Sequence, residues 1–434
     1  MDLYDNEPHG VYFLIDNKSF YASCEAVERG LNPLKVPLVV LSEADNTGDG
    51  LVLATSPEAK RLYHLQNNVS RKRDLPADPR LIIVPPRMNH YIKMNLAINQ
   101  LFLNFTSEND LVVYSIDESI LNMTHSWRLF GASPRQVAQR IQRTIRKKLG
   151  LYTTIGIGDN PLQAKIALDI YAKHAQDLIG EIHYETVPQK LWTIENLTDV
   201  WSIANRTATH LERLGIHNLN ELAHANPYLL KQEMGIIGEQ LFALSWGIDR
   251  TNVNVRPKVK SASIGNSQVL PRDYHLQSEI ELVIKEIGEQ VAARLRHHHK
   301  KTTGLSLTIG FSNAEQENDG RHGFSGTTRI ESTNNDRDIT KALISLFQSL
   351  WDGQSIWNIA VYAFKLVTDN NLQLNLFIQP EQQLKNNQIG HVIDEIHDRF
   401  GFTSLVKASS LLPGGTAINR ASLTGGHNGG NAYE

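Results

Sequence analysis

The chain has 434 residues, more than one ordinary hydrophobic core holds, which predicts about two to four domains. Hydrophobic residues make up 41% and charged residues 21%, as in folded soluble proteins. No segment approaches about 18 consecutive apolar residues, and the acidic start has no signal-peptide pattern, so we expect a cytoplasmic protein without membrane contact. The net charge of -3 gives no sign of nucleic-acid binding by itself, and the single cysteine, Cys24, excludes an internal disulfide and a thiolate zinc site.

The first part of the chain alternates between strand and helix patterns. Runs of β-branched and aromatic residues predict strands at 11–16, 36–41, 51–54, 81–84, 111–116, 120–123 and 152–157. Apolar spacing predicts helices at 19–28, 89–104, 134–149 and 161–175, with another that begins at Pro57. This order is typical of a split βαβ sheet with an inserted hairpin-and-helix unit.

The second part begins with helices from about 187 to 246 and a non-periodic basic linker at 251–260. Alternating strand and helix patterns from 261 to 377 predict a second mixed α+β domain. A polar stretch at 379–388, a short amphipathic helix near 392–400 and a Gly-rich end follow. We expect the last 15 or so residues to be disordered.

Three acidic residues stand where buried strands end. Asp16 ends the first strand, and Asp117 and Glu118 follow the strand at 111–116. An ionised carboxylate at the end of a buried strand is unfavourable without a strong counter-charge. Because hard oxygen ligands suit Mg²⁺, these acids predict a site for a pair of such ions, completed by water and substrate phosphates.

Three stretches resemble the Y-family translesion DNA polymerases: DNKSFYAS at 16–23, YSIDE at 114–118 and GIGDNPLQAK at 156–165. The similarity is closest to the UmuC-like branch, which includes the catalytic subunit type of bacterial DNA polymerase V and its Gram-positive relatives. It runs in order from about residue 11 to about residue 427.

The resemblance implies an α+β multidomain fold, a right-hand polymerase with a split βαβ (ferredoxin-like) palm, small fingers, a helical thumb and an α+β little finger. The boundaries that we predict are 1–29 and 80–178 for the palm, 30–79 for the fingers, 179–250 for a helix-hairpin-helix-like thumb, 251–260 for a linker, 261–378 for the little finger and 379–434 for a partly disordered C-terminal extension.

The resemblance also implies that Asp16, Asp117 and Glu118 hold two Mg²⁺ ions, with the backbone carbonyl of Asn17 as a further ligand. The ions would promote attack of the primer 3′-hydroxyl on the α-phosphate of a dNTP and stabilise the pyrophosphate that leaves. The alternative is that Asp16 lies in a turn and that the other two acids lie on a solvated hairpin.

Tyr21 lies five residues after the first acid, where the family has its sugar gate, a ring that leaves no room for a ribose 2′-hydroxyl. The alternative is a core aromatic, a role that suits Phe20 better.

For the triphosphate, the resemblance implies Lys60 and Arg61 on the fingers helix and Lys173 in the palm. Pro57 stands where many relatives have a phosphate-contacting tyrosine, which puts that contact in doubt. Since Lys165, Asp169 and Lys173 are spaced i, i+4 and i+8, they also fit a surface charge ladder; we favour phosphate binding for Lys173 and a structural role for Lys165.

Contacts to DNA are predicted in two regions. In the thumb, Ser202 and Ala204 replace the glycines of a helix-hairpin-helix, which leaves phosphate binding and simple packing equally open. In the little finger, a run of fixed positive charges would follow the duplex backbone; these residues are Arg294, Arg296, Lys300 and Lys301. The same charges would also be favourable as cations at a helix C-terminus, and the three histidines between them lack metal-ligand spacing.

The segment Gln373-Leu374-Asn-Leu376-Phe377 has the form of the pentapeptide with which bacterial polymerases bind the sliding clamp. The alternation of leucines also fits a half-buried strand, but the polar segment that follows favours an accessible peptide.

We therefore predict a template-directed, error-prone translesion polymerase at the nucleoid in the DNA damage response, with primer-template DNA, dNTPs and the sliding clamp as partners. Whether an accessory subunit or a recombinase filament takes part stays open. The alternatives are a catalytically weak, clamp-tethered factor that occupies primer ends, and a nucleotide cyclase.

Overall fold

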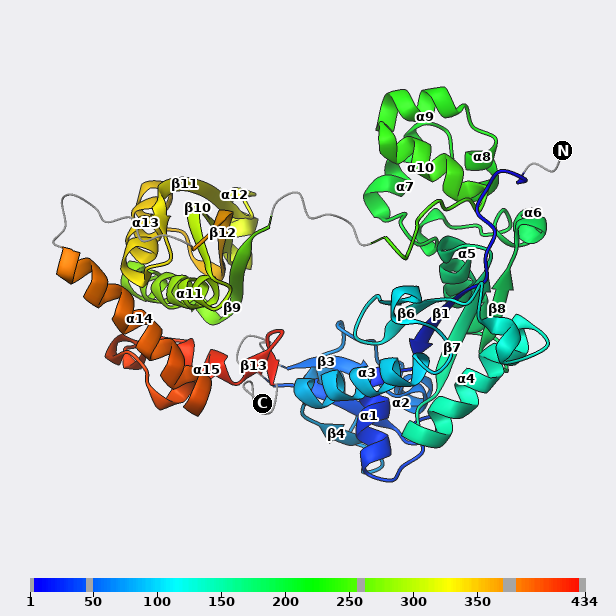
Figure 1. Ribbon diagram of the computed structural model, residues 1–434, viewed down its shortest axis with the longest axis horizontal. Coiled ribbons are helices and arrows are strands. Elements are labelled where there is room, and N and C mark those ends of the chain that lie inside the picture. Colours follow the sequence, from blue (N-terminus) through cyan, green and yellow to red (C-terminus); the bar gives the residue numbers. More distant parts are fainter. Residues whose placement is uncertain (1–3, 44–49, 256–261, 370–379, 429–434) are drawn as a thin grey trace.

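The computed structural model describes residues 4–43, 50–255, 262–369 and 380–428. A helical thumb stands above the palm sheet, the fingers lie below it, and the little finger forms a separate α+β unit at the other side of the molecule (Figure 1). No helix in the described ranges is both long and apolar enough to cross a membrane.

The palm is a five-stranded sheet in the order β5-β6-β1-β7-β8. The strands are β1 (Tyr12–Asn17), β5 (Leu111–Val113), β6 (Glu118–Asn122), β7 (Thr153–Gly158) and β8 (Ile179–Ile182). The central β1 is antiparallel to β6 and β7. Its side chains alternate between two cores: Phe13 and Ile15 face α1 (Phe20–Glu28), α3 (Met88–Phe102) and α4 (Pro134–Leu149), whereas Leu14 faces α5 (Pro161–Ile166) and the turn after it.

The helix after β7 differs from the single helix predicted at 161–175. The structure has α5 and then a π-helical turn over Ala167–Ala172. This element lies very close to the sheet, since a Cβ added at Gly156 would lie 2.0 Å from the Ala164 carbonyl oxygen. Insertion of a residue into a helix leaves no hydrophobic signature, so the pattern could not predict it.

The fingers contain a three-stranded sheet, β3-β2-β4, from β2 (Leu38–Ser42), β3 (Leu51–Thr55) and β4 (Ile82–Val84). The predicted hairpin of β2 and β3 is confirmed, and α2 (Pro57–Tyr63) begins at Pro57 with Ser56 as its N-cap. The strand at 82–84, which the sequence places in the palm, pairs in parallel with β2 instead.

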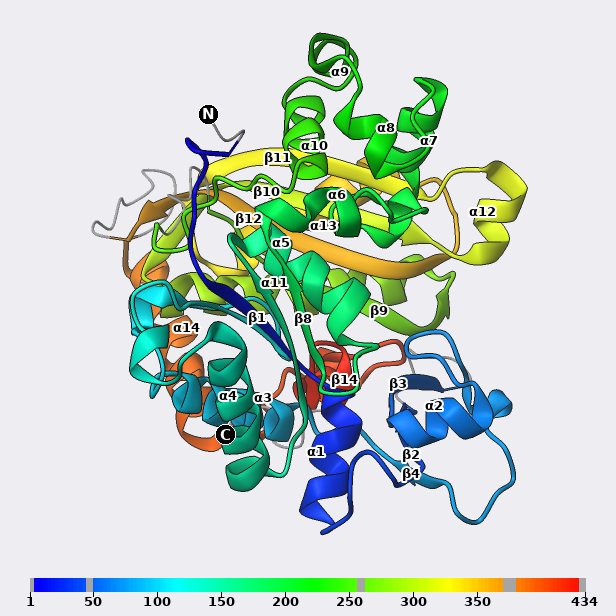
Figure 2. The same ribbon diagram turned by 90° about the vertical axis from the view of Figure 1, so that its right-hand side faces the viewer.

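The thumb is helical, as predicted, with α6 (Val187–Lys190), α7 (Asn205–Arg213), α8 (Leu219–Ala223), α9 (Pro227–Met234) and α10 (Ile236–Ser245). Its core includes Leu162 and Ile166 of α5, so the thumb is built directly on a palm helix. Figure 2 shows these helices above the palm from a second direction.

The little finger is a four-stranded antiparallel sheet, β11-β10-β12-β9. Its elements are β9 (Ile264–Tyr274), α11 (Gln277–His297), β10 (Lys300–Phe311), α12 (Asn313–Asp319), β11 (Gly323–Thr333), α13 (Asp336–Leu350) and β12 (Ile356–Thr368). One core joins α11 and α13 to the sheet, which confirms the predicted α+β unit.

The C-terminal extension is more ordered than predicted. The polar stretch at 379–388 falls largely within α14 (Pro380–Phe400), since proline suits a first helical turn and Gln, Glu and Lys favour helix. Part of the tail expected to be disordered forms α15 (Ala417–Ala421), β13 (Leu423–Thr424) and β14 (His427–Asn428).

Specific contacts anchor this tail. Oε2 of Glu286 accepts hydrogen bonds from the Thr416 and Ala417 amides (2.9 Å each), while His427 Nδ1 lies 3.0 Å from Ser42 Oγ in the fingers. Figure 1 shows β13 beside β3, and Figure 2 shows β14 near the same strand, so the extension connects the little finger to the fingers.

Candidate active site

The three acids predicted to act together lie at one end of the palm sheet. Strand pairing places Asp16, near the end of β1, directly across from Glu118 at the start of β6, and Asp117 immediately precedes Glu118. The Asn17 amide and its side-chain Nδ2 both donate to the Asp117 carbonyl, at 2.9 and 3.0 Å. Two stretches separated by a hundred residues are thus fixed together by backbone hydrogen bonds.

The side chains of these acids contact cations of the chain. Lys165 Nζ lies 2.6 Å from Glu118 Oε1 and 3.2 Å from Asp169, and Lys173 Nζ lies 2.7 Å from Asp169 and 3.8 Å from Asp16 Oδ2. The π-helical turn carries Asp169 and places it between the two lysines. Charges therefore alternate in a chain from Glu118 to Asp16.

Burial nevertheless disfavours the charged form of one of these acids, Asp16. Burial raises the pKa of Asp16 to about 6; Lys173 opposes this effect, and Asp117 and Glu118 add to it by repulsion. Asp117 accepts a hydrogen bond from Ser115 Oγ at 2.7 Å. A carboxylate with a raised pKa, in a cavity beside two others, is typical of a functional site.

These residues are of the types that bind a divalent cation, but their side chains are not all in position to bind one together. Carboxylate oxygens are the ligands that Mg²⁺ prefers, and the buried Oδ1 of Asn17 accepts no hydrogen bond from the part of the chain that the structure describes. Within the described ranges, however, no three His, Cys, Asp or Glu side chains are placed to hold one ion together. Asp16 and Glu118 each point toward a lysine here, so joint binding requires them to leave those lysines.

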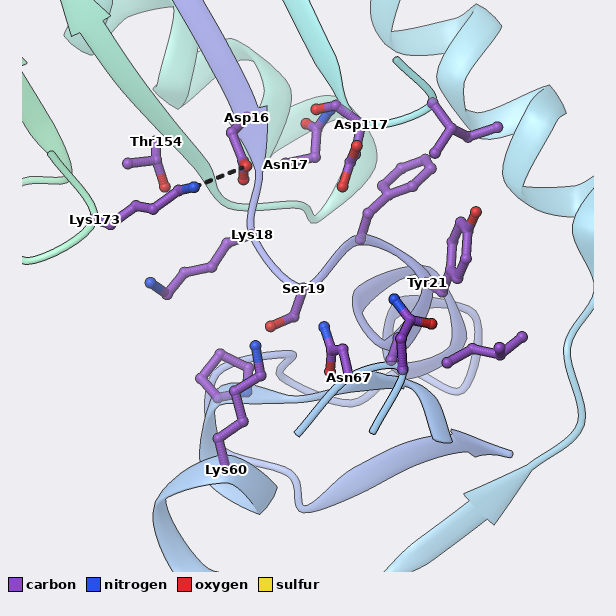
Figure 3. Close-up of a pocket in the computed structure, with 16 residues that line it drawn as sticks. Asp16, Asn17, Lys18, Ser19, Tyr21, Lys60, Asn67, Asp117, Thr154 and Lys173 are labelled. Atoms are coloured by element: carbon purple, nitrogen blue, oxygen red, sulfur yellow. Dashed lines mark hydrogen bonds and ion pairs between the residues drawn. The ribbon is translucent and has the colours of Figure 1, made fainter. Parts of the chain in front are cut away.

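A cavity of about 610 Å³ opens beside these acids, between palm and fingers. Asp16, Asp117, Tyr21, Lys60 and Lys173 all line it, as the sequence prediction requires of an active site. Figure 3 shows the lysines on one side of the cavity and the Tyr21 ring on the other, with the two aspartates along its upper edge.

The cavity also contains residues that the sequence analysis missed. Lys18 and Thr154 belong to or follow the palm strands, and Asn67 comes from the fingers. Burial and then repulsion from Lys18 lower the pKa of Lys60, so these cations lie close enough to disfavour one another. The sequence did offer one signal for Lys18, which stands two residues after the first acid, Asp16.

Arg61 is not part of this cavity lining. It forms a bidentate ion pair with Glu58, at 2.9 and 2.6 Å, and its side chain is 67% exposed. Consecutive residues of a helix point in different directions, so Lys60 faces the cavity and Arg61 faces solvent. Arg61 therefore lies outside the cavity in this structure, and its predicted contact with the triphosphate stays a prediction.

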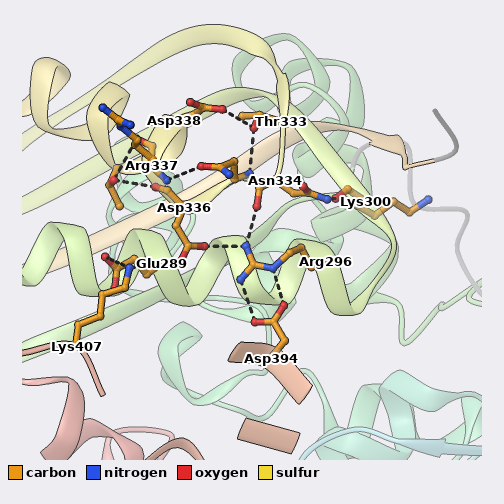
Figure 4. Close-up of polar contacts among 12 residues, drawn as sticks. Glu289, Arg296, Lys300, Thr333, Asn334, Asp336, Arg337, Asp338, Asp394 and Lys407 are labelled. Carbon is orange, nitrogen blue, oxygen red and sulfur yellow. Dashed lines mark hydrogen bonds and ion pairs between the residues drawn. The ribbon is translucent and has the colours of Figure 1, made fainter. Parts of the chain in front are cut away.

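The four basic residues predicted to contact DNA also divide into two kinds. Arg296 is buried and bonds to Asp336 at 2.7 Å and to Asp394 at 2.5 and 2.9 Å, as Figure 4 shows. Lys301 is nearly buried and pairs with Asp369 at 2.6 Å. Both pair with carboxylates of the chain in this structure, and their predicted contacts with DNA stay predictions.

Arg294 is exposed and donates to the Gly265 carbonyl, and Lys300 is partly exposed and donates to the Thr368 hydroxyl. These bonds involve neutral oxygens and leave the positive charges uncompensated in those contacts.

The thumb hairpin keeps a glycine-like conformation without glycine. Ser202 has φ of 80°, in the left-handed region, and Val200 and Ile203 beside it are buried. The hairpin geometry therefore persists although a serine stands where a glycine would be. The segment predicted to bind the clamp, with Gln373, Leu374, Leu376 and Phe377, lies outside the described residues.

Comparison with known proteins agrees with this geometry. Residues 15–169 match the model of the impB/mucB/samB family, and residues 261–376 match the model of that family's C-terminal domain. The chain is 37% identical over 425 residues to the putative UV-damage repair protein UvrX of Bacillus subtilis, covering 98% of this chain and 99% of that protein. It is 35% identical over 422 residues to DNA polymerase IV 2 of Bacillus subtilis, covering 96% and 98%.

Among solved structures, a Y-family DNA polymerase chimera superimposes with a TM-score of 0.66 over 82% of this chain and 99% of that one, at 19% identity. That likeness establishes the right-hand α+β fold. The chain belongs to the impB/mucB/samB family of UmuC-like Y-family DNA polymerases, which confirms the resemblance seen in the sequence. It is a DNA-directed DNA polymerase of the translesion class.

Proposed function

We propose that Asp16, Asp117 and Glu118 hold two divalent cations and that the adjoining cavity binds a dNTP opposite a template base. The observation that carries this proposal is the cavity itself, which has acids at one edge, lysines on one side and an aromatic ring on the other. A nucleoside triphosphate has the matching order of parts, since its phosphates need cations and its sugar presents an apolar face.

When bound, the cations would activate the primer 3′-hydroxyl and neutralise charge on the reacting phosphates. The chain's own contribution is position. Asp16 and Glu118 would leave Lys173 and Lys165, respectively, to hold a cation, and Lys173 would become available to the triphosphate.

Lys60, Lys18 and Lys173 would share the triphosphate charge. Because burial and repulsion from Lys18 lower the pKa of Lys60, a phosphate beside it would relieve an unfavourable interaction as well as form a new one. Tyr21 would act as the sugar gate, and its position across the cavity from the lysines supports this role.

Arg294 and Lys300 remain candidates for contacts with the DNA backbone, since their charges are available. Clamp binding through residues 373–377 and an association with the nucleoid rest on the sequence alone. A cyclase and a catalytically weak primer-end factor are not favoured, because a relative named a DNA polymerase matches over nearly the whole chain.

The test is extension of a primed template, including one with an abasic site, by wild type and Asp117→Ala. We expect loss of at least about a hundredfold in rate for the variant. The matched control is Glu108→Gln, which removes an exposed acid before β5, at the opposite end of that strand from Asp117, and should extend like wild type. Equal extension by wild type and Asp117→Ala would refute the proposed role of the acids.

A further inference from the structure

The Tyr21 ring does not stand alone in the cavity wall. It stacks on the ring of Tyr91, with centroids 4.4 Å apart and planes inclined by 14°. Tyr91 comes from α3 in the palm and is fully buried, whereas Tyr21 is partly buried and lines the cavity. One ring therefore faces the ligand space, and the other supports it from behind.

Tyr91 is itself fixed at its hydroxyl, which donates to Glu25 Oε1 at 2.8 Å. Glu25 is fully buried and accepts from Arg87 at 2.9 and 2.7 Å and from Arg29 at 2.5 Å. A buried carboxylate is stable only when it is paired in this way. Burial would raise the pKa of Glu25, but these hydrogen bonds outweigh it and keep the carboxyl ionised below its usual pKa.

The arrangement fixes Tyr91 at two points on one helix. Tyr21 and Glu25 are four residues apart on α1 and thus lie on the same face of it. Tyr91 contacts the first through its ring and the second through its hydroxyl. Any tilt of the Tyr21 ring away from the cavity would have to displace a side chain held by this network.

We propose that Tyr91 is a positioning residue that sets the discrimination between deoxyribonucleotides and ribonucleotides by keeping the Tyr21 ring upright in the cavity. The inference rests on the proposed gate role of Tyr21. The Tyr21 ring excludes a 2′-hydroxyl only if it cannot move out of the way. The Tyr91 ring fills the space behind it and so prevents that movement. Removal of that ring opens a space into which the gate can tilt.

The experiment compares single-nucleotide insertion of a dNTP and the matching rNTP in one preparation of each variant, so that the folded fraction cancels from the ratio of the two kcat/KM values. Tyr91→Leu removes the ring and the hydroxyl. Tyr91→Met also removes both and puts a flexible side chain, which yields to the Tyr21 ring, in place of the rigid ring, so the test remains if the leucine variant fails to fold. We expect both to lose about 10-fold in selectivity, chiefly through faster insertion of the rNTP.

Tyr91→Phe is the matched control, because it keeps the stacked ring and loses only the bond to Glu25; its selectivity should stay within about threefold of wild type. Tyr21→Ala should lose more selectivity than any of these, and adding Tyr91→Leu to it should change nothing further. Wild-type selectivity in Tyr91→Leu and Tyr91→Met, together with a loss in Tyr21→Ala, would overturn the role of Tyr91 alone. Wild-type selectivity in Tyr21→Ala would overturn the gate, and this inference with it.

Discussion

The palm cavity and the polar cluster of the little finger contain the same kinds of residue and differ in how completely their charges are paired. In the little finger, Arg296 lies between Asp336 and Asp394 and also donates to the Asn334 carbonyl at 2.9 Å, which satisfies both ends of the guanidinium. In the palm, Asp16 keeps a raised pKa although Lys173 is near it. The first cluster stabilises a fold, and the second is prepared for a ligand.

This difference could not be read from the sequence, because a basic run looks the same whether its partners are carboxylates of the chain or phosphates of DNA. Arg296 and Arg294 are two residues apart on α11 and have opposite surroundings. Four predictions would sharpen or break the distinction.

The largest expected effect is on stability. Arg296→Ala leaves two carboxylates without their partner, and removal of one member of a buried ion pair typically costs about 3–5 kcal/mol. We expect the little finger to unfold at lower denaturant concentration, as measured by equilibrium denaturation. Unchanged stability would mean that the pairs in Figure 4 do not hold the domain together.

Substitution of Asp16, in contrast to that of Arg296, should increase the stability of the protein at neutral pH. Its folded pKa of about 6 lies above the ordinary aspartate pKa of 3.8, so the folded state binds the proton more tightly and stability falls as pH rises from about 4 to 6. Asp16→Asn should therefore be more stable than wild type at pH 7 by up to about 3 kcal/mol, with the gap closing below about pH 4.

Denaturation of both proteins across that pH range, without divalent cation, measures the gap. If Asp16→Asn is no more stable than wild type at pH 7, burial does not disfavour the ionised form of Asp16.

Lys60→Ala should raise KM for the dNTP about 10-fold with a smaller change in kcat, because a charged hydrogen bond to phosphate contributes about 1.5 kcal/mol. Arg61→Ala is the matched control, since its side chain points to solvent and pairs with Glu58. Steady-state insertion kinetics measure KM for both variants. An equal rise in KM for Lys60→Ala and Arg61→Ala would contradict the claim that only Lys60 faces the cavity.

The smallest effect is on DNA affinity. Arg294→Ala should weaken binding of primer-template a few-fold and reduce the slope of log affinity against log salt by about 0.9. Under the same conditions Lys301→Ala should leave that slope unchanged, since Lys301 pairs with Asp369. A titration of labelled DNA at several salt concentrations decides, and equal slopes for Arg294→Ala and wild type would remove Arg294 from the DNA contacts.

Much of the fold could be predicted from periodicity. The strands that end in Asp16 and precede Asp117, the helix that begins at Pro57 and the α+β character of residues 261–377 all follow from local patterns that the structure confirms. The parallel pairing of β4 with β2 could not be predicted, because a short apolar strand fits either sheet equally well.

At the site, local sequence predicted residues that the structure brings to one cavity, among them Asp16, Asp117 and Lys60, but it could not identify partners from distant elements. Tyr91 gave no signal because it is one aromatic residue in an amphipathic helix, and only the tertiary fold brings it to Tyr21. The contacts of Lys165 likewise depend on a π-helical turn that no hydrophobic pattern encodes.

The central claim is that the palm acids exchange their lysine partners for divalent cations when substrate binds. Crystals of the complex with primer-template, a non-hydrolysable dNTP and Mn²⁺, recorded at a wavelength where manganese scatters anomalously, test this claim most directly. We predict anomalous peaks in contact with Asp16, Asp117 and Glu118, with Lys173 moved onto the triphosphate. Bound nucleotide with no peak at these acids, and with the contacts of Lys165 to Glu118 and Lys173 to Asp16 intact, would contradict the account.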